Sequence, residues 1–276
     1  MKTALVQLTS SDDPAENLQQ ASHYIKEAAS LGAQFVLTPE VTNCVSQDRA
    51  RQQAVLSFED DDPTLAGLRE LAADQSIWLS IGSLAIKTGD PDGRFANRSY
   101  LIDPSGAIAA YYDKIHMFDV TVSDTESYRE SAGYRPGERA VVAETPIGQI
   151  GLSVCYDVRF AYLYRALAQA GAEVILVPSA FSPVTGAAHW EPLLRARAIE
   201  TGSYVLAAAQ TGTHPSISGK SRQTYGHGMA ISPWGEVLVD MGTQPGVAVV
   251  DLDLGEVAKT RKRIAALEHD RPFTGP

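Results

Sequence analysis

The sequence predicts an α/β fold made of two similar halves that pack sheet to sheet, with helices on the outside. Apolar periodicity alternates between strand and helix along most of the chain. Residues 32–40 and 171–179 share one pattern, since each ends a helix on glycine, continues as a buried strand and stops at proline. Several late strands follow one another without helices between them, which argues against a barrel or a doubly wound sheet.

The first half of the chain carries clear start and turn signals. Asp13-Pro14 is an N-cap followed by proline in the first turn, and the helix it opens is expected to end near Gly32. The run 103–106, Asp-Pro-Ser-Gly, is a turn between two strands. The expected helices are 13–32 and 63–75, and the expected strands are 3–8, 34–37, 77–84, 99–102 and 107–112.

The second half continues the alternation and ends in strands. Gly171 is expected to end a helix, and Pro233-Trp234-Gly235 is expected to turn between two of the last strands. The expected helices are 160–170 and 189–200, and the expected strands are 149–154, 174–177, 204–208, 227–231, 237–240 and 247–251. No linker interrupts the chain, so residues 1–276 are expected to form a single domain.

Composition excludes several classes of protein. The chain has 276 residues and a net charge of −10, and an acidic surface repels nucleic acid and anionic lipid, so we expect no nucleic-acid and no membrane partner. Two cysteines are too few for a disulfide framework or a four-ligand zinc site, and we expect no metal and no cofactor. The absence of a signal-peptide core or an apolar spanning run predicts a cytoplasmic protein.

Cys155 is the candidate nucleophile. It ends an apolar strand and precedes Tyr156, Asp157 and a predicted helix, so its thiol would face the positive end of a helix dipole. That position lowers the pKa of a thiol and offers backbone N–H groups to an oxyanion. A buried structural cysteine is an equally weighted alternative. Cys44 has no following helix signal, and we interpret it as an inert thiol.

A thiol nucleophile needs a base and an electrophile. The six histidines show neither metal-ligand spacing nor a motif with cysteine. Glu40 ends an apolar run at the mouth of a buried strand, where desolvation would raise its pKa and make it a base. Lys114 follows a strand among aromatic and apolar residues and could stabilise an oxyanion, although alone it would be interpreted as an edge-strand charge.

Two patterns resemble sites of other kinds. Gly219-Lys220-Ser221 ends like a phosphate-binding loop, but His214 occupies the first glycine position and no helix pattern follows, so we expect a surface loop. The acidic run 59–62 precedes Pro63 and is typical of a solvated helix start. Neither pattern predicts a phosphate- or metal-dependent enzyme.

Four blocks, in order and spread over nearly the whole chain, resemble the nitrilase superfamily of carbon–nitrogen hydrolases. The blocks are Leu37-Thr38-Pro39-Glu40, Tyr112-Asp113-Lys114-Ile115-His116, Glu130-Ser131 with Pro136-Gly137, and the run 151–160 around Cys155. Each block is a weak signal alone, and the four together are specific. The resemblance implies a four-layer αββα sandwich, commonly a homodimer formed through helices on one face.

The resemblance also implies catalytic roles for matching residues. Cys155 would be the nucleophile, and Glu40 would act as base and then as acid. Lys114 and the backbone N–H of Tyr156 would stabilise the oxyanion. Glu130 matches the second glutamate of the family, which helps to position the site.

Later blocks resemble the Nit-type amidase branch: 178–181, 185–186, 189–191, 195–200 and 269–272. The likeness implies hydrolysis of a small-molecule amide through a thioester, with a 2-oxo acid amide such as deaminated glutathione as substrate. Arg159 could pair with a substrate carboxylate, and Phe181 and Thr185 could line the same pocket. The alternatives are an omega-amidase, an N-carbamoyl amino acid hydrolase, an aliphatic amidase or a nitrilase, or a non-catalytic ligand-binding protein of this fold.

Overall fold

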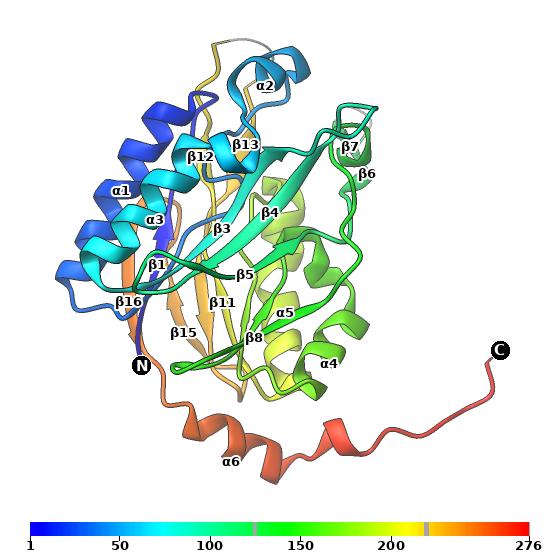
Figure 1. Ribbon diagram of the computed structural model, residues 1–276. Coiled ribbons are helices and arrows are strands. Elements are labelled where there is room, and N and C mark those ends of the chain that lie inside the picture. Colours follow the sequence, from blue (N-terminus) through cyan, green and yellow to red (C-terminus); the bar gives the residue numbers. More distant parts are fainter. Residues whose placement is uncertain (124–125, 218–220, 276) are drawn as a thin grey trace.

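Two six-stranded sheets pack face to face between outer helices, so the layers follow the order helix, sheet, sheet, helix (Figure 1). This layer order confirms the αββα sandwich predicted from the sequence. The computed structural model describes residues 1–123, 126–217 and 221–275. Gly219 and Lys220 of the predicted surface loop lie outside the described residues. Across those ranges, no helix has the length and apolar character needed to cross a bilayer.

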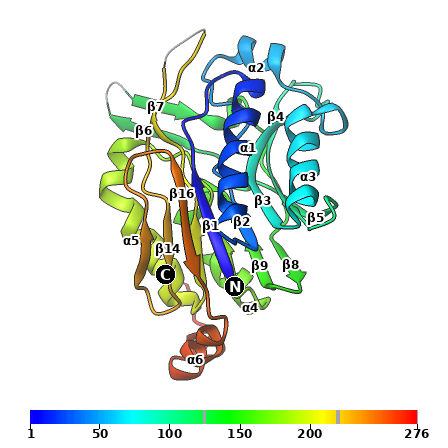
Figure 2. The same cartoon turned by 90° about the vertical axis from the view of Figure 1, so that its left-hand side faces the viewer.

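The first sheet brings the two ends of the chain together. Its order is β16-β1-β2-β3-β4-β5, in which β1, β2 and β3 are parallel and the remaining neighbours are antiparallel. Two helices cover its outer face (Figure 2). The strands are β16 (Gly246–Asp251), β1 (Lys2–Gln7), β2 (Phe35–Leu37), β3 (Trp78–Lys87), β4 (Phe95–Ile102) and β5 (Ile108–Asp113), and the helices are α1 (Pro14–Ser30) and α3 (Pro63–Gln75).

The second sheet repeats the first. Its order is β8-β9-β10-β11-β14-β15, with β9, β10 and β11 parallel and the remaining neighbours antiparallel. The two similar halves predicted from residues 32–40 and 171–179 are thus present as β2 and β10, each at the same place in its sheet. The elements are β8 (Val141–Thr145), β9 (Gly148–Leu152), β10 (Val174–Leu176), β11 (Tyr204–Ala207), β14 (Met229–Ile231), β15 (Val237–Asp240), α4 (Ala161–Gln169) and α5 (Pro183–Thr201).

Helix α1 illustrates how the sequence sets an element. The Asp13 side chain accepts hydrogen bonds from the backbone N–H groups of Ala15 and Glu16, at 2.9 and 3.3 Å, and so caps the helix. Its buried side chains recur every three or four positions and face the sheet: Asn17, Ala21, Ile25 and Ala28. Both faces of β1 are buried, because the helix layer covers one face and the second sheet covers the other.

Several elements differ from the sequence prediction. Helix α5 begins at Pro183 rather than at His189, since proline is well tolerated in the first helical turn. Gly186 lies in the part of α5 that precedes the predicted start, where a Cβ would come within 2.3 Å of the Tyr225 ring. The prediction also missed the shorter elements: α2 (Arg49–Val55), α6 (Gly255–Arg263), β6 (Asp119–Ser123), β7 (Glu126–Arg129), β8, β12 (Thr211–Thr213) and β13 (Gln223–Tyr225).

The ends of β2 and β10 meet at Gly82 of β3. A Cβ on Gly82 would lie 2.0 Å from the carbonyl oxygen of Thr38, 2.5 Å from Cβ of Pro178 and 2.6 Å from the carbonyl oxygen of Pro39. The β3–β4 register shifts beside this glycine, between Ile81 and Leu84, as in a β-bulge. Only a residue without a side chain lets the two prolines that follow β2 and β10 approach each other this closely.

Replacing Gly82 with alanine should therefore destabilise the fold. The new methyl group would contact backbone oxygens that cannot move aside, and overpacking of a core costs about 1–3 kcal/mol. The free energy of unfolding, measured by urea denaturation, should fall by that amount. The control is Gly275→Ala, whose Cβ would have no atom within 4 Å and should change stability by less than about 0.5 kcal/mol. Equal stability of the two variants would contradict this account.

Candidate active site

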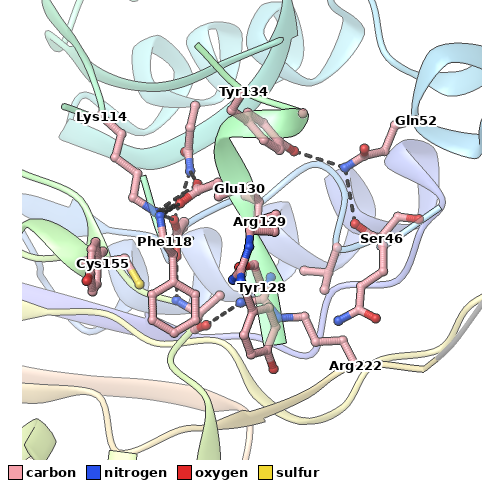
Figure 3. A pocket seen from close by; sticks show the side chains of 18 of the residues that line it. Ser46, Gln52, Lys114, Phe118, Tyr128, Arg129, Glu130, Tyr134, Cys155 and Arg222 are labelled. Carbon is pink, nitrogen blue, oxygen red and sulfur yellow. Dashed lines mark hydrogen bonds and ion pairs between the residues drawn. The ribbon is translucent and has the colours of Figure 1, made fainter. Parts of the chain in front are cut away.

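A cavity of about 440 Å³ opens where β2, β9 and β10 end (Figure 3). The carboxyl ends of parallel strands are the usual ligand-binding edge of an α/β sheet. The cavity walls bring together five side chains predicted from the sequence: Glu40, Lys114, Glu130, Cys155 and Phe181. Tyr156, whose backbone N–H was predicted to bind an oxyanion, lines the cavity as well.

Cys155 occupies a strained turn directly after β9. Its φ is +49°, a left-handed conformation that a residue with a side chain adopts at a cost. Its backbone N–H donates to the Pro178 carbonyl oxygen at 2.9 Å, so this N–H is occupied and cannot bind an oxyanion. The turn continues as the short 3₁₀ helix Cys155–Arg159, and α4 starts only at Ala161. The helix predicted at residues 160–170 is therefore present within one residue at each end, and the sharp strand-to-helix turn is present too. The 3₁₀ helix between them was not predicted.

The pKa of the Cys155 thiol is raised, whereas the sequence predicted that it would be lowered. Burial raises it most, and the negative charge of Glu40 raises it further, while the positive charge of Lys114 opposes both. A neutral thiol is favoured because a thiolate here would be desolvated beside a carboxylate. The reason for the error is that both the burial of the thiol and the charge of Glu40 arise from packing between distant strand ends, which the local sequence does not reveal.

Glu40 lies at the centre of the site and is almost fully buried. Its Oε1 accepts hydrogen bonds from Lys114 Nζ and Asn97 Nδ2, both at 2.9 Å. Its Oε2 accepts the backbone N–H of Ala180 at 2.8 Å, across from the other sheet. The thiol of Cys155 lines the same cavity, where burial and the negative charge of Glu40 raise its pKa. One carboxylate thus joins residues that follow or belong to β4, β5 and β10.

The pKa of Glu40 is lowered, which corrects the raised value predicted from its apolar surroundings. Burial by itself raises the pKa, but the charge and hydrogen bond of Lys114 and the charge of Arg222 outweigh burial. A carboxylate that accepts several hydrogen bonds from a cation and from backbone N–H is stabilised in its ionised form. Glu40 therefore rests as a carboxylate, ready to accept a proton.

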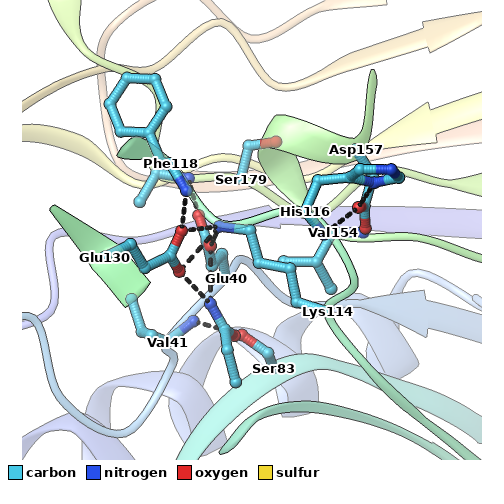
Figure 4. Close-up of polar contacts among 12 residues, drawn as sticks. Glu40, Val41, Ser83, Lys114, His116, Phe118, Glu130, Val154, Asp157 and Ser179 are labelled. Carbon is cyan, nitrogen blue, oxygen red and sulfur yellow. Dashed lines mark hydrogen bonds and ion pairs between the residues drawn. The ribbon is translucent and has the colours of Figure 1, made fainter. Parts of the chain in front are cut away.

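Lys114 is a buried ammonium held by two carboxylates rather than an exposed edge-strand charge. Its Nζ donates to Glu40 Oε1 at 2.9 Å and to both oxygens of Glu130, at 2.9 and 2.8 Å (Figure 4). Burial lowers the pKa of Lys114, but Glu130 and Glu40 raise it well above its ordinary value. The backbone N–H of Phe118 donates to Glu130 at 2.7 Å and fixes that second carboxylate.

Three groups at this site carried no signal in the sequence. Asn97 of β4 binds Glu40 and also Glu130, at 2.9 and 3.2 Å, and its type and position resemble any inward-facing strand residue. The backbone of Ala180 acts through its N–H, which no residue type reveals. Arg222 lies far along the chain from every matching block and reaches the cavity from the strand β13 region.

Some predicted site residues lie elsewhere. Arg159 and Thr185 are not among the residues that line the cavity. The Arg159 guanidinium lies over the Phe181 ring, 5.4 Å from its centroid, with two nitrogens 3.4 Å from Nδ1 of His189. Cys44 does line the cavity, and burial and the nearby Asp12 raise its pKa to about 12.

The arrangement has the parts needed to open an amide bond. A thiol, a resting carboxylate and a permanent ammonium meet in one largely buried site, and such groups can supply nucleophile, base and charge stabilisation. In the ranges that the structure describes, no group of three or more His, Cys, Asp and Glu residues could hold a metal ion. This arrangement of groups fits a cysteine-dependent amidase.

Comparison with known proteins identifies the family. The family model described as carbon–nitrogen hydrolase matches residues 2–262. The deaminated glutathione amidase of Yersinia enterocolitica is 40% identical over 97% of this chain and 92% of its own length. This chain belongs to the carbon–nitrogen hydrolase family, within the nitrilase superfamily, as its four sequence blocks predicted.

Solved structures support the same assignment. The NitFhit protein of C. elegans has a TM-score of 0.89 and 36% identity over 98% of this chain, which spans 65% of that longer protein. The amidase from Nesterenkonia sp. AN1, in a variant that carries acrylamide added to its active-site cysteine, has a TM-score of 0.77 and 29% identity, and covers 96% of this chain and 98% of its own.

The buried charges make a prediction for stability. Lys114→Met would leave Glu40 and Glu130 facing each other without their cation, and breaking a buried ion pair from one side costs about 3–5 kcal/mol. Urea denaturation should show that loss. Lys259→Met removes a well-exposed lysine from α6 and should change stability by less than about 1 kcal/mol. If the free energy of unfolding falls by the same small amount in both variants, Lys114 does not neutralise Glu40 and Glu130 in the buried site.

Proposed function

We propose that this chain hydrolyses a small 2-oxo acid amide, such as deaminated glutathione, through a thioester at Cys155. The observation that carries the proposal is the position of Glu40, whose carboxylate accepts a hydrogen bond from the Lys114 ammonium and lines the same cavity as the Cys155 thiol. The name of the Yersinia enterocolitica relative supports this choice of substrate. Hydrolysis of N-carbamoyl amino acids, aliphatic amides or nitriles is the competing outcome of the assay below.

The first half of the reaction forms the thioester. The thiol has a raised pKa and Glu40 a lowered one, so the resting pair is thiol and carboxylate, and proton transfer to Glu40 accompanies attack of sulfur on the amide carbon. Lys114 supplies positive charge to the oxyanion, and the backbone N–H of Tyr156, in the first turn of its 3₁₀ helix, donates a hydrogen bond. Glu40 returns the proton to the nitrogen as the C–N bond breaks, and the amine or ammonia leaves.

The second half releases the acid. Water gives a proton to Glu40 while its oxygen attacks the thioester carbon, and the same two groups stabilise the second oxyanion. Collapse breaks the C–S bond, and Glu40 protonates the departing sulfur, which restores the resting state. A group that alternates between base and acid in this way needs a partner such as Lys114 that keeps its own charge throughout.

The two thiols of the cavity provide the test of this proposal. Cys155→Ala should abolish release of ammonia or amine, because no other group can form the thioester. Cys44→Ala should keep turnover, since Cys44 packs in an apolar cluster with Val45 and Leu56 rather than in the hydrogen-bond network of Glu40. Both variants are assayed on a panel of 2-oxo acid amides, N-carbamoyl amino acids, aliphatic amides and nitriles, with mass spectrometry of the acyl-enzyme. Full activity of Cys155→Ala would overturn the mechanism, and preference for another member of the panel would overturn the substrate.

We also propose that residues 1–276 act as one cytoplasmic domain and assemble as a homodimer. Two sheets share one core, which supports a single domain, and both cysteines are free, which suits a reducing compartment. Large apolar side chains are exposed on the outer layer formed by α4 and α5, among them Tyr162, Val184 and Ile199. Covering this layer with a second copy of the chain would remove these side chains from water.

The dimer proposal predicts a change in mass. A charge in an apolar interface is costly to bury, so Ile199→Asp should shift the protein from dimer to monomer in sedimentation velocity at micromolar concentration. Leu31→Asp changes a similarly exposed apolar residue at the end of α1, on the other outer layer, and should leave the dimer intact. A wild-type protein that sediments as a monomer would contradict the proposal.

A further inference from the structure

His116 contacts the active-site structure from outside the cavity. It follows Lys114 by two positions, its side chain is 12% exposed, and it is absent from the described residues that line the cavity. Its ring stacks on the Phe160 ring, with 3.6 Å between the centroids and an angle of 8° between the planes. Nδ1 lies 2.6 Å from Oδ1 of Asp157, and Nε2 lies 2.5 Å from the hydroxyl of Tyr162. A histidine held at both nitrogens and on one face has a fixed orientation.

Asp157 is a fully buried carboxylate that accepts four hydrogen bonds. Its Oδ2 accepts the Tyr112 hydroxyl at 2.7 Å and the Val154 N–H at 2.9 Å. Its Oδ1 accepts the backbone N–H of His116 at 3.1 Å and the Nδ1–H of the same residue at 2.6 Å. The proton is assigned to Nδ1 because a carboxylate only accepts hydrogen bonds, and Nε2 of the neutral ring then accepts the Tyr162 hydroxyl. Two of the four hydrogen bonds therefore come from His116.

The residues joined by the Asp157 carboxylate flank both catalytic side chains. Tyr112 and His116 lie two positions before and two positions after Lys114. Asp157 itself lies two positions after Cys155. The carboxylate therefore joins the end of β5 in the first sheet to the turn that follows β9 in the second (Figure 4). In the described ranges, no hydrogen bond joins Lys114 directly to Cys155, so their separation depends on indirect contacts such as these.

The turn at Cys155 needs support from its surroundings. Its φ of +49° is a strained conformation, which persists only where neighbouring contacts fix it. The hydrogen bond from the Val154 N–H to Asp157 closes this turn, and His116 holds the other oxygen of the same carboxylate. Without the His116 side chain, Oδ1 would keep only a backbone donor, and the carboxylate would be free to rotate. A displacement of about 1 Å at a reacting group can cost about 100-fold in rate.

We propose that His116 is a positioning residue that, through Asp157, fixes the Cys155 thiol relative to the Lys114 ammonium. The proposal rests on the proposed function, because amide hydrolysis needs these two groups at one carbonyl. His116 takes no proton from the thiol, since both of its ring nitrogens are occupied and the ring lies outside the cavity lining. Tyr162 is the outer end of this chain of hydrogen bonds and is exposed on α4.

Two substitutions of His116 separate its hydrogen bonds from its stacking. His116→Phe keeps a ring on Phe160 but loses both side-chain hydrogen bonds. His116→Asn places an amide N–H where the Nδ1–H lies and keeps the hydrogen bond to Asp157. On any amide that the wild-type protein hydrolyses, His116→Phe should lower kcat about 10- to 100-fold and change KM less than about 3-fold. His116→Asn should recover kcat to within about 5-fold of the wild type.

A merely structural role predicts a different result. It would lower the folded fraction and the midpoint of thermal unfolding, but kcat per mole of folded protein, measured well below that midpoint, would stay unchanged. His23→Phe replaces an exposed histidine of α1, and this control should change neither kcat nor KM. Unchanged kcat in His116→Phe, or an equal loss in His116→Phe and His116→Asn, would overturn the proposal.

The outer hydrogen bond gives a second comparison. Tyr162→Phe removes the hydroxyl that binds Nε2 of His116 and leaves the contact with Asp157 in place, so kcat should fall less than about 5-fold. A loss as large as that of His116→Phe would overturn the assignment to Asp157.

Alkylation of Cys155 tests the positioning without amide turnover. The chain has two cysteines, so in a Cys44→Ala parent protein the reaction of Cys155 with iodoacetamide is followed by mass spectrometry. Because the thiol must pass its proton to Glu40 during attack, adding His116→Phe should slow alkylation at least about 5-fold, and adding His116→Asn should leave it close to the parent rate. Equal rates in the parent and the His116→Phe protein would overturn the proposal. If the wild type hydrolyses no amide, the proposed function fails, while the alkylation rates still decide the role of His116.

Discussion

The buried ammonium of Lys114 is the interaction on which the rest of this site depends. Two carboxylates, Glu40 and Glu130, can share a small buried space only because a cation lies between them. Without that charge, burial would protonate one or both, and the resting base would be lost. The same contacts bring the ends of β2 and β5 close to the start of the Glu130–Ala132 turn. The charge of Lys114 therefore determines both the electrostatics and the shape of the cavity.

Duplication of the sheet explains why these groups meet. Equivalent strands β2 and β10 end at equivalent prolines, and the side-chain-free Gly82 lets the prolines approach. One half then supplies the carboxylate of Glu40, and the other supplies the backbone N–H of Ala180, which donates a hydrogen bond to that carboxylate. Packing between sheets, rather than either sheet alone, creates the catalytic arrangement.

Much of this could be predicted from the chain, and the exceptions have physical reasons. Strong periodicity and helix signals identified α1, α3 and most strands of both sheets, and Pro-Glu and Cys at strand ends identified the reactive groups. The directions of the pKa shifts could not be predicted, because burial of the Cys155 thiol and charges from strands distant in sequence set them. The roles of Asn97 and Arg222 could not be predicted, because a single polar residue that faces inward forms no recognisable sequence pattern. Ala180 contributes through its backbone N–H, which its residue type does not reveal.

The pairing of β1 with β16 has a consequence for how the protein forms on the ribosome. These neighbouring strands lie at opposite ends of the sequence, with Lys2 opposite Asp251, so the first sheet cannot close until almost the whole chain has been synthesised. The second sheet can assemble earlier, because its strands, from β8 to β15, are closer in sequence. Contacts this distant slow folding and leave an open strand edge in the meantime. During synthesis, the edge of β1 that pairs with β16 therefore stays open until the last strand has been made.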